Sequence, residues 1–209
     1  MIIVTNKTVV TNHSKAKERA HWVAKAGVLT ALAVVLMYLE LSLPFVPVFL
    51  KFDFSEVVVL IASFALGPVT GILVELVKNL LHLPATQTGG VGELANFIIG
   101  ISFVGTAGLV YQKMKTKRGA YLAMGIGILA MTFLASLINY FFLIPFYIRV
   151  MGLPLDVIVD MVHEAGNTLV TDLKTLIWFV FVPFNLFKGL IVSVIVAVVY
   201  KRISPLLHR

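Results

Sequence analysis

Residues 174–200, KTLIWFVFVPFNLFKGLIVSVIVAVVY, decide the fold class of this chain. The stretch is apolar almost throughout and is longer than the roughly 20 residues that a helix needs to cross a bilayer. Lys188 lies near its middle, where a charge costs about 2.5–3.5 kcal/mol on insertion scales. Asn185 lies three residues earlier and therefore on the same helical face. Pro183 leaves the carbonyl oxygen of Phe179 without its helical donor. The stretch predicts a kinked transmembrane helix whose polar face binds a ligand, or whose Lys is structural and bonds to backbone carbonyls of neighbouring helices.

The composition of the whole chain is also typical of a membrane protein. Of its 209 residues, 59% are hydrophobic and 13% are charged, against about 45–50% and roughly 25% in soluble domains. This excludes an ordinary soluble enzyme, a disordered chain and a nucleic-acid-binding domain. The net charge of +7 comes from basic residues that cluster in a few short stretches, which favours cytoplasmic loops over a nucleic-acid surface.

Sequence motifs for catalysis and for metal or nucleotide binding are missing. The chain has no cysteine, which excludes disulfides, thiol catalysis and cysteine-ligated metals. It contains no P-loop, no H-E-x-x-H and no G-x-S-x-G motif. We therefore expect neither an enzyme nor a resident cofactor.

Outward from residues 174–200, further apolar stretches predict an all-α integral membrane protein with six transmembrane helices. The expected spans are Trp22–Leu43, Phe52–Leu66, Val69–Leu83, Glu93–Tyr111, Gly119–Tyr147 and Lys174–Tyr200. The segment Arg149–Thr171 is predicted to be a loop with one short surface helix. We expect one membrane domain over residues 22–203, with a basic N-terminal tail at 1–21 and a C-terminal tail at 204–209.

The distribution of Lys and Arg predicts the orientation of the chain. With both termini in the cytoplasm, the cytoplasmic segments hold 12 of the 17 basic residues. The densest group is the loop KMKTKR at 113–118. Because cytoplasmic loops carry an excess of Lys and Arg, we expect both termini to lie in the cytoplasm. The protein itself is expected in the cell membrane.

Two of the other expected spans also carry polar residues. Glu75, Lys78, Asn79 and His82 are spaced so that they lie on one stripe of a helix. Glu75 and Lys78 can pair, so we favour an internal ion pair that joins helices. Asn139 lies in the outer half of its span and offers a donor and an acceptor side by side, to a ligand or to a neighbouring helix.

Two features are expected at the outer mouth of the bundle. Glu93 and Asn96 share a helical face there and either cap the helix or contact a ligand. The loop at 44–51 is apolar and contains Phe45 and Phe49. Such a loop suits a lid over an apolar ligand or an aromatic belt at the membrane interface.

The first span also carries a stripe of small residues. Ala20, Ala24, Gly27 and Ala31 follow one another at steps of four, three and four. Small residues allow another helix to approach closely. The stripe packs either within the bundle or against a partner membrane protein.

Together these residues resemble the riboflavin-binding (RibU-type) S-components of energy-coupling factor (ECF) transporters. The resemblance covers residues 20–203. It rests on FLKFDFS at 49–55, ALGPVTG at 65–71, Lys78-Asn79, Asn96-Phe97, Asn139-Tyr140 and PFNLFKG at 183–189. The last motif, with Asn and Lys three residues apart, is the most specific.

The resemblance implies an S-component bundle that binds riboflavin from outside the cell as a transported ligand, with FMN as a second candidate ligand. Asn139, Asn185 and Lys188 would hydrogen-bond the edge of the isoalloxazine ring, and Phe49 and Leu50 would form apolar walls. The ligand-binding residues that we expect are Asn139, Asn185, Lys188, Phe49, Leu50, Asn96 and Glu93.

The resemblance also implies partner proteins. A separate transmembrane coupling subunit would contact the stripe Ala20, Ala24, Gly27 and Ala31, and two ATPase subunits would drive release inside. Four alternatives remain: an S-component for a different vitamin, a facilitator that needs no ATPase, a membrane enzyme and a purely structural subunit. The missing catalytic motifs argue against the enzyme, and the costly Lys188 argues against the structural subunit.

Overall fold

The computed structural model describes residues 5–207, and it describes side chains for residues 15–200. The helices are α1 (Thr5–Tyr38), α2 (Ser55–Leu66), α3 (Pro68–His82), α4 (Val91–Lys113), α5 (Lys117–Ile138), α6 (Ile144–Arg149), α7 (Leu155–Glu164), α8 (Leu173–Leu176) and α9 (Val182–Leu207). A 3-10 turn, η1 (Leu83–Ala85), follows α3, and π-helical turns join α5 to α6 (η2, Asn139–Leu143) and α8 to α9 (η3, Ile177–Phe181). The strands are β1 (Leu41–Ser42) and β2 (Lys51–Phe52). Residues 1–4 and 208–209 of the two predicted tails lie outside the described part.

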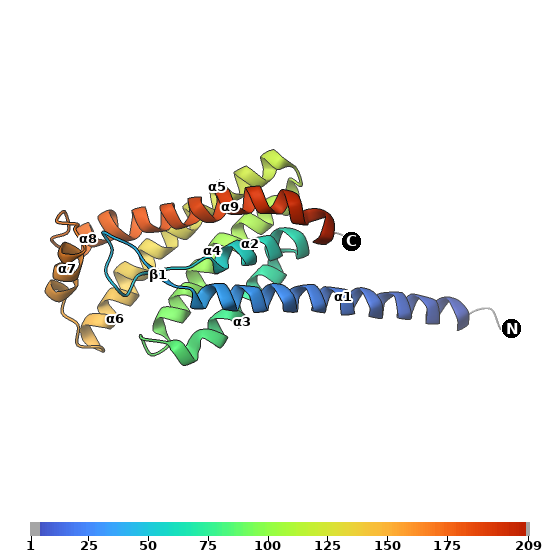
Figure 1. The fold of residues 1–209 in the computed structure, drawn as a ribbon, viewed down its shortest axis with the longest axis horizontal. Helices are drawn as coiled ribbons and strands as arrows, with labels where there is room; N and C mark the ends of the chain where they lie inside the picture. The colour runs from blue at the N-terminus through green and yellow to red at the C-terminus, as the bar shows by residue number, and fades with distance from the viewer. Residues whose placement is uncertain (1–4, 208–209) are drawn as a thin grey trace.

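Both ends of the described chain lie at the same end of the helix bundle (Figure 1). The helices α6, α7 and α8 and the connection from α1 to α2 lie at the opposite end. The first half of α1 projects beyond the rest of the bundle (Figure 1). The two chain ends are therefore separated along the bundle from α6, α7, α8 and the connection between α1 and α2 (Figure 1).

Among the described residues, four helical segments are long and apolar enough to cross a membrane. They are Lys15–Tyr38, Val91–Lys113, Lys117–Arg149 and Leu173–Tyr200. The remaining two expected spans correspond to α2, with 12 residues, and α3, with 15 residues. At 1.5 Å per residue both are shorter than the roughly 30 Å of a hydrocarbon core.

The expected first span, Trp22–Leu43, differs from the observed helix at both ends. The helix α1 already begins at Thr5, so most of the predicted tail continues the helix instead of preceding it. It ends at Tyr38, because Leu41 and Ser42 pair in antiparallel register with Phe52 and Lys51. Apolarity alone predicted a continuation to Leu43, but these residues form a β-ladder.

The other boundaries agree more closely with the expected spans. The second span was expected from Phe52, but the helix begins at Ser55 because Phe52 belongs to β2. The predicted short helix in 149–171 is α7. The helix α8 begins with a capping box, in which the backbone amide of Thr175 hydrogen-bonds the Asp172 carboxylate and thereby lowers its pKa.

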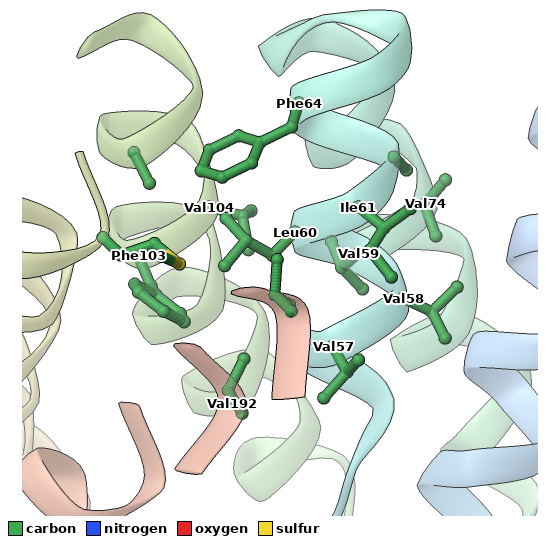
Figure 2. Packing of buried hydrophobic residues seen from close by; sticks show 14 of the residues in the cluster. Val57, Val58, Val59, Leu60, Ile61, Phe64, Val74, Phe103, Val104 and Val192 are labelled. Atoms are coloured by element: carbon green, nitrogen blue, oxygen red, sulfur yellow. The ribbon is translucent and has the colours of Figure 1, made fainter. Parts of the chain in front are cut away.

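Helix α2 forms the centre of the larger apolar core. All its residues from Ser55 to Phe64 are buried. Figure 2 shows Leu60 of this helix between Val104 of α4 and Val192 of α9. A helix that is buried all round faces protein and not lipid. The short length of α2 is therefore compatible with a membrane protein, since its neighbours cover it.

Helix α3 has the reverse pattern of a soluble amphipathic helix. Its polar residues Glu75, Lys78 and Asn79 are buried, while Val69 and Leu80 are exposed. In a bilayer the exposed apolar face contacts lipid, and the polar face is satisfied inside the protein. The position of α3 thus brings ionised side chains into the middle of the bundle.

A second apolar cluster lies at the end that carries α6, α7 and α8. Its buried members include Ile144 and Tyr147 of α6, Ile158 of α7 and Leu176 of α8. Phe49 and Leu50 of the connection before α2 pack against this cluster. The candidate site described next draws its walls from both apolar clusters.

Candidate ligand-binding site

A cavity of about 360 Å³ opens between the two apolar clusters. Its walls come from the end of α1, the connection to α2, the facing ends of α3 and α4, the α5–η2–α6 segment and the η3–α9 segment. The volume lies in the range of small-molecule sites, roughly 300–1,000 Å³. The residues predicted to bind ligand all line it: Phe49, Leu50, Glu93, Asn96, Asn139, Asn185 and Lys188. The structure therefore brings the whole predicted set to one place.

Asn139 presents an unused acceptor to this region. It is the first residue of η2, and its Nδ2 donates to the carbonyl oxygen of Ala135 at 2.8 Å. Its Oδ1 is buried and has no hydrogen-bond partner among the described residues. A buried polar atom of this kind costs about 1–3 kcal/mol unless something satisfies it. A ligand N–H group at this position would do so.

Asn185 is held in a similar way on the opposite wall. Its Nδ2 donates to the carbonyl oxygen of Phe181 at 2.8 Å. In both cases the amide nitrogen is engaged by the helix itself, since a carbonyl oxygen can only accept. Each side chain therefore keeps its Oδ1 acceptor and one N–H of its Nδ2 for other partners.

Both Asn residues lie at π-helical turns. Asn139 begins η2, and Asn185 bonds to Phe181, the last residue of η3. Single π turns within α-helices occur frequently at functional sites. The carbonyl oxygen of Phe179, which Pro183 was predicted to leave without a helical donor, accepts a hydrogen bond from Nδ2 of Asn167 at 3.2 Å. The loop between α7 and α8 thus satisfies the backbone of the helix that carries the site.

Lys188 is paired with two carboxylates. Its Nζ lies 3.1 Å from Oδ2 of Asp53 and 3.1 Å from Oε2 of Glu56. The structural alternative predicted that this Lys bonds to backbone carbonyls of neighbouring helices. Its observed partners are carboxylates instead. Sequence reasoning missed Asp53 and Glu56 as site residues. Their signal was two acidic residues, three positions apart, at the start of a stretch otherwise predicted to span the membrane.

Lys78 extends this cluster to α3. Its Nζ lies 3.0 Å from Oε2 of Glu75 and 3.1 Å from Oε1 of Glu56, and it donates to Oγ of Ser55 at 2.6 Å. The predicted pair of Glu75 and Lys78 is thereby confirmed. Ser55 in turn donates to the carboxylate of Asp53. Because Glu56 bridges both lysines, the cluster joins α2, α3 and α9 to the connection before α2.

Gly100 of α4 allows the close approach of this cluster. A Cβ placed on Gly100 would overlap Oε1 of Glu75. That oxygen accepts a hydrogen bond from Nδ2 of Asn79 at 3.0 Å. The glycine therefore leaves room for a buried carboxylate between α3 and α4.

A second polar group lies where α3 and α4 face each other. Nδ1 of His82 lies 3.1 Å from Oε1 of Glu93, and its Nε2 lies 3.6 Å from Oε1 of Glu40. Thr86 donates to Oε2 of Glu93 at 2.7 Å. Glu93 therefore bonds to the preceding segment and does not cap its own helix. Oδ1 of Asn96 is buried and unpaired within the described part of the chain, as for Asn139.

The connection between α1 and α2 forms one wall of the cavity. Phe49 and Leu50 line it, and the ring of Phe49 meets that of Tyr147 edge-on at 5.4 Å. The backbone N–H of Phe45 donates to the carbonyl oxygen of Ala165 at 2.9 Å. Tyr147 also lines the cavity but was missed, because an aromatic residue in an apolar span has the same sequence pattern whether it packs in a core or faces a ligand.

The small-residue stripe of α1 faces away from the bundle. Ala20, Ala24, Gly27 and Ala31 are all exposed. The opposite side of α1 packs into the bundle through Leu29, Ala33 and Met37. Within the described part of the chain, the stripe is therefore not packed inside the bundle, which was one of its two predicted uses.

The family model for the substrate-specific component of ECF transporters matches residues 22–200 of this sequence. The chain belongs to this family. As a substrate-specific component (S-component), it is a multi-pass membrane transport protein and not an enzyme.

Individual relatives of this S-component agree with the family assignment. The riboflavin transporter RibU of Staphylococcus aureus is 35% identical over 183 residues, which cover 88% of this chain and 90% of the relative. The riboflavin transporter FmnP of Bacillus subtilis is 31% identical over 186 residues, covering 88% and 92%. A solved structure described as the S component of a bacterial ECF transporter superposes with a TM-score of 0.72 at 31% identity, covering 91% of this chain and 99% of that chain.

Proposed function

We propose that this S-component binds riboflavin in the cavity from outside the cell and delivers it inward together with a transmembrane coupling subunit and two ATPase subunits. Two relatives at 35% and 31% identity are riboflavin transporters. The observation that carries the proposal is the buried, unpaired Oδ1 of Asn139 in a cavity that also holds Asn185 and Lys188.

The polar groups of the cavity complement the pyrimidine-like edge of a flavin. That edge alternates an N–H donor with carbonyl acceptors, so Oδ1 of Asn139 is placed to accept from the N–H. Lys188 has three donor hydrogens, of which Asp53 and Glu56 engage two. The third is available to a flavin carbonyl. Phe49 and Leu50 provide apolar surface for the dimethylbenzene end.

Six helical segments cross or fill the membrane in this proposal: α1, α2, α3, α4, α5–α6 and α8–α9. The termini and the basic loop at 113–118 lie in the cytoplasm, as the excess of Lys and Arg indicates. The position of both described chain ends at one end of the bundle is consistent with that orientation (Figure 1). The cavity then opens to the outside, and residues 22–203 form one membrane domain.

The exposed stripe Ala20, Ala24, Gly27 and Ala31 is the contact with the coupling subunit in this proposal. Helix α1 presents these small residues where no side chain of the described bundle covers them. Small residues are enriched where membrane helices pack closely. The stripe is therefore suited to a partner helix.

A titration of the detergent-purified protein with riboflavin tests the proposal. Bound flavin loses fluorescence when its ring stacks in an aromatic site, so we expect saturable quenching that thiamin and biotin do not reverse. The double variant Asn185→Leu with Lys188→Leu should lose this quenching. Absence of quenching with the unaltered protein, after any co-purified flavin has been removed, would contradict riboflavin as the ligand.

A further inference from the structure

The charged residues that line the cavity are predominantly acidic. Glu40, Asp53, Glu56 and Glu93 contribute four carboxylates, whereas Lys51 and Lys188 contribute two ammonium groups. The imidazole of His82 also lines the cavity. The four carboxylates therefore outnumber the basic groups of the lining even when the imidazole is counted among them, so the lining carries an excess of negative charge.

The acidic residues divide into two groups by their partners. Asp53 and Glu56 pair with Lys188, and Glu56 also pairs with Lys78. These carboxylates are neutralised within the buried cluster. Glu93 and Glu40 lie on the two sides of His82 instead. The excess negative charge is thus concentrated where α3 and α4 face the end of α1.

Glu93 is held in place by protein contacts. His82 engages one of its carboxylate oxygens at 3.1 Å, and Thr86 donates to the other at 2.7 Å. Its side chain is only 8% exposed. A charge that is fixed and largely removed from water acts on its surroundings more strongly than a solvated one.

Glu40 extends the same charge to the rim of the cavity. Its side chain is 31% exposed, and its Oε1 lies 3.6 Å from His82. Lys51, in the hairpin of β1 and β2, is half-buried, and its Nζ donates to the hydroxyl of Ser42 at 3.2 Å. Among the described residues no ion pair joins Lys51 to Glu40 or Glu93, so direct contact with this Lys does not neutralise them.

We propose that Glu40 and Glu93 form a fixed negative charge that makes the cavity select the uncharged riboflavin against its phosphate ester, FMN. This inference rests on the proposed riboflavin function and adds the basis of its specificity. A phosphate monoester carries about −1.5 to −2 charges at pH 7. Placing like charges side by side in a site partly removed from water is unfavourable, whereas the neutral ribityl hydroxyl of riboflavin meets no such penalty.

The test measures the affinities of the purified full-length protein for riboflavin and for FMN by fluorescence quenching. The variants are Glu40→Gln and Glu93→Gln, which remove charge while keeping size and hydrogen-bonding atoms. Glu164→Gln is the matched control, since Glu164 is exposed on α7 and does not line the cavity. The readout is the ratio of the two dissociation constants, because this ratio cancels any general loss of folded protein.

We expect unaltered protein to bind riboflavin more tightly than FMN. Each cavity variant should improve the ratio in favour of FMN by about tenfold, and the control should leave it unchanged. The inference is overturned if the unaltered protein binds both flavins equally. It is also overturned if both cavity variants still bind riboflavin and have the same ratio of dissociation constants as the unaltered protein. If the unaltered protein binds neither flavin, the proposed function itself is wrong. Glu40→Gln keeps the test decisive should Glu93→Gln fail to fold, since Glu40 is partly exposed.

Discussion

At the level of single residues, Asn139 should separate ligand binding from stability. Replacing it with Leu removes the acceptor for the flavin N–H, so we expect riboflavin affinity to fall by at least about tenfold. The same change removes a buried oxygen that has no partner within the described structure. The unfolding temperature should therefore not fall. Flavin titration and thermal unfolding of the same sample measure the two effects.

Ser193→Ala is the matched control for this prediction. The Ser193 hydroxyl is likewise buried without a partner in the described part of the chain, but it does not line the cavity. It should change neither the affinity nor, appreciably, the stability. An Asn139→Leu variant that binds riboflavin as tightly as the unaltered protein would remove Asn139 from the site.

Lys188 should show the opposite behaviour, with a large effect on stability. Lys188→Met leaves Asp53 and Glu56 without this ammonium group, and breaking a buried ion pair on one side costs about 3–5 kcal/mol. Adding Asp53→Asn to Lys188→Met should restore part of the unfolding temperature but not flavin binding. Equal unfolding temperatures for the single and the double variant would show that the Asp53 carboxylate left without Lys188 carries no penalty.

The sequence predicted several individual residues of the site, but not all of the contacts between them. Lys188 and Asn139 could be predicted because a polar residue in an apolar span needs a reason. Glu75 and Lys78 could be paired because they lie one helical turn apart. The contact between Lys188 and Asp53 could not be predicted from the sequence, because it depends on how two segments far apart in the chain pack together.

At the level of elements, the packing of α4 against α5 depends on Gly127. A Cβ at this position would lie 2.9 Å from the ring and the carbonyl oxygen of Phe103. We expect Gly127→Ala to destabilise the protein by about 1–3 kcal/mol, as overpacking does. Thermal unfolding in detergent measures the change.

Gly125, two residues earlier in α5, provides the control for Gly127. A Cβ there meets nothing within 4 Å in the structure as described. Gly125→Ala should therefore be neutral, or stabilising by up to about 1 kcal/mol because Ala is the better helix former. Equal effects of the two substitutions would contradict the close approach of α4 and α5.

Element boundaries were predictable where apolar runs end at turn residues. The Gly67-Pro68 turn and Pro84 indicated the ends of α2 and α3 correctly, because these residues interrupt helical hydrogen bonding. The end of α1 was wrong by five residues, since the pairing of β1 with β2 depends on the partner strand. The short length of α2 has its explanation in complete burial, which a single sequence does not display.

At the level of the whole molecule, the absence of cysteine from the sequence makes orientation easy to measure. Single cysteines placed by Lys115→Cys and Leu169→Cys lie at exposed positions in the α4–α5 loop and between α7 and α8. With the cytoplasm on the side of the basic loop, a membrane-impermeant maleimide should label Leu169→Cys in intact cells. It should label Lys115→Cys only after permeabilisation, and the reverse pattern would invert the proposed orientation.

The exposed stripe on α1 gives a second whole-molecule prediction. Gly27→Leu places a large side chain where the described structure has no atom within 4 Å of a Cβ. The isolated S-component should fold and bind riboflavin normally, but uptake by cells should be lost because a partner helix can no longer approach. Val28→Leu, at a neighbouring exposed position outside the stripe, should leave uptake intact. Normal uptake with Gly27→Leu would place the partner elsewhere.

The ion pair between Asp53 and Lys188 joins positions 135 residues apart. During synthesis the acidic partner is made first, because the ribosome works from the N-terminus. Lys78 arrives soon afterwards and can engage Glu56, but Asp53 waits for its basic partner until the last membrane helix emerges. A chain that stops before residue 188 therefore lacks the ammonium group that pairs with Asp53. Closure of this pair marks the point in biogenesis at which the final helix has docked.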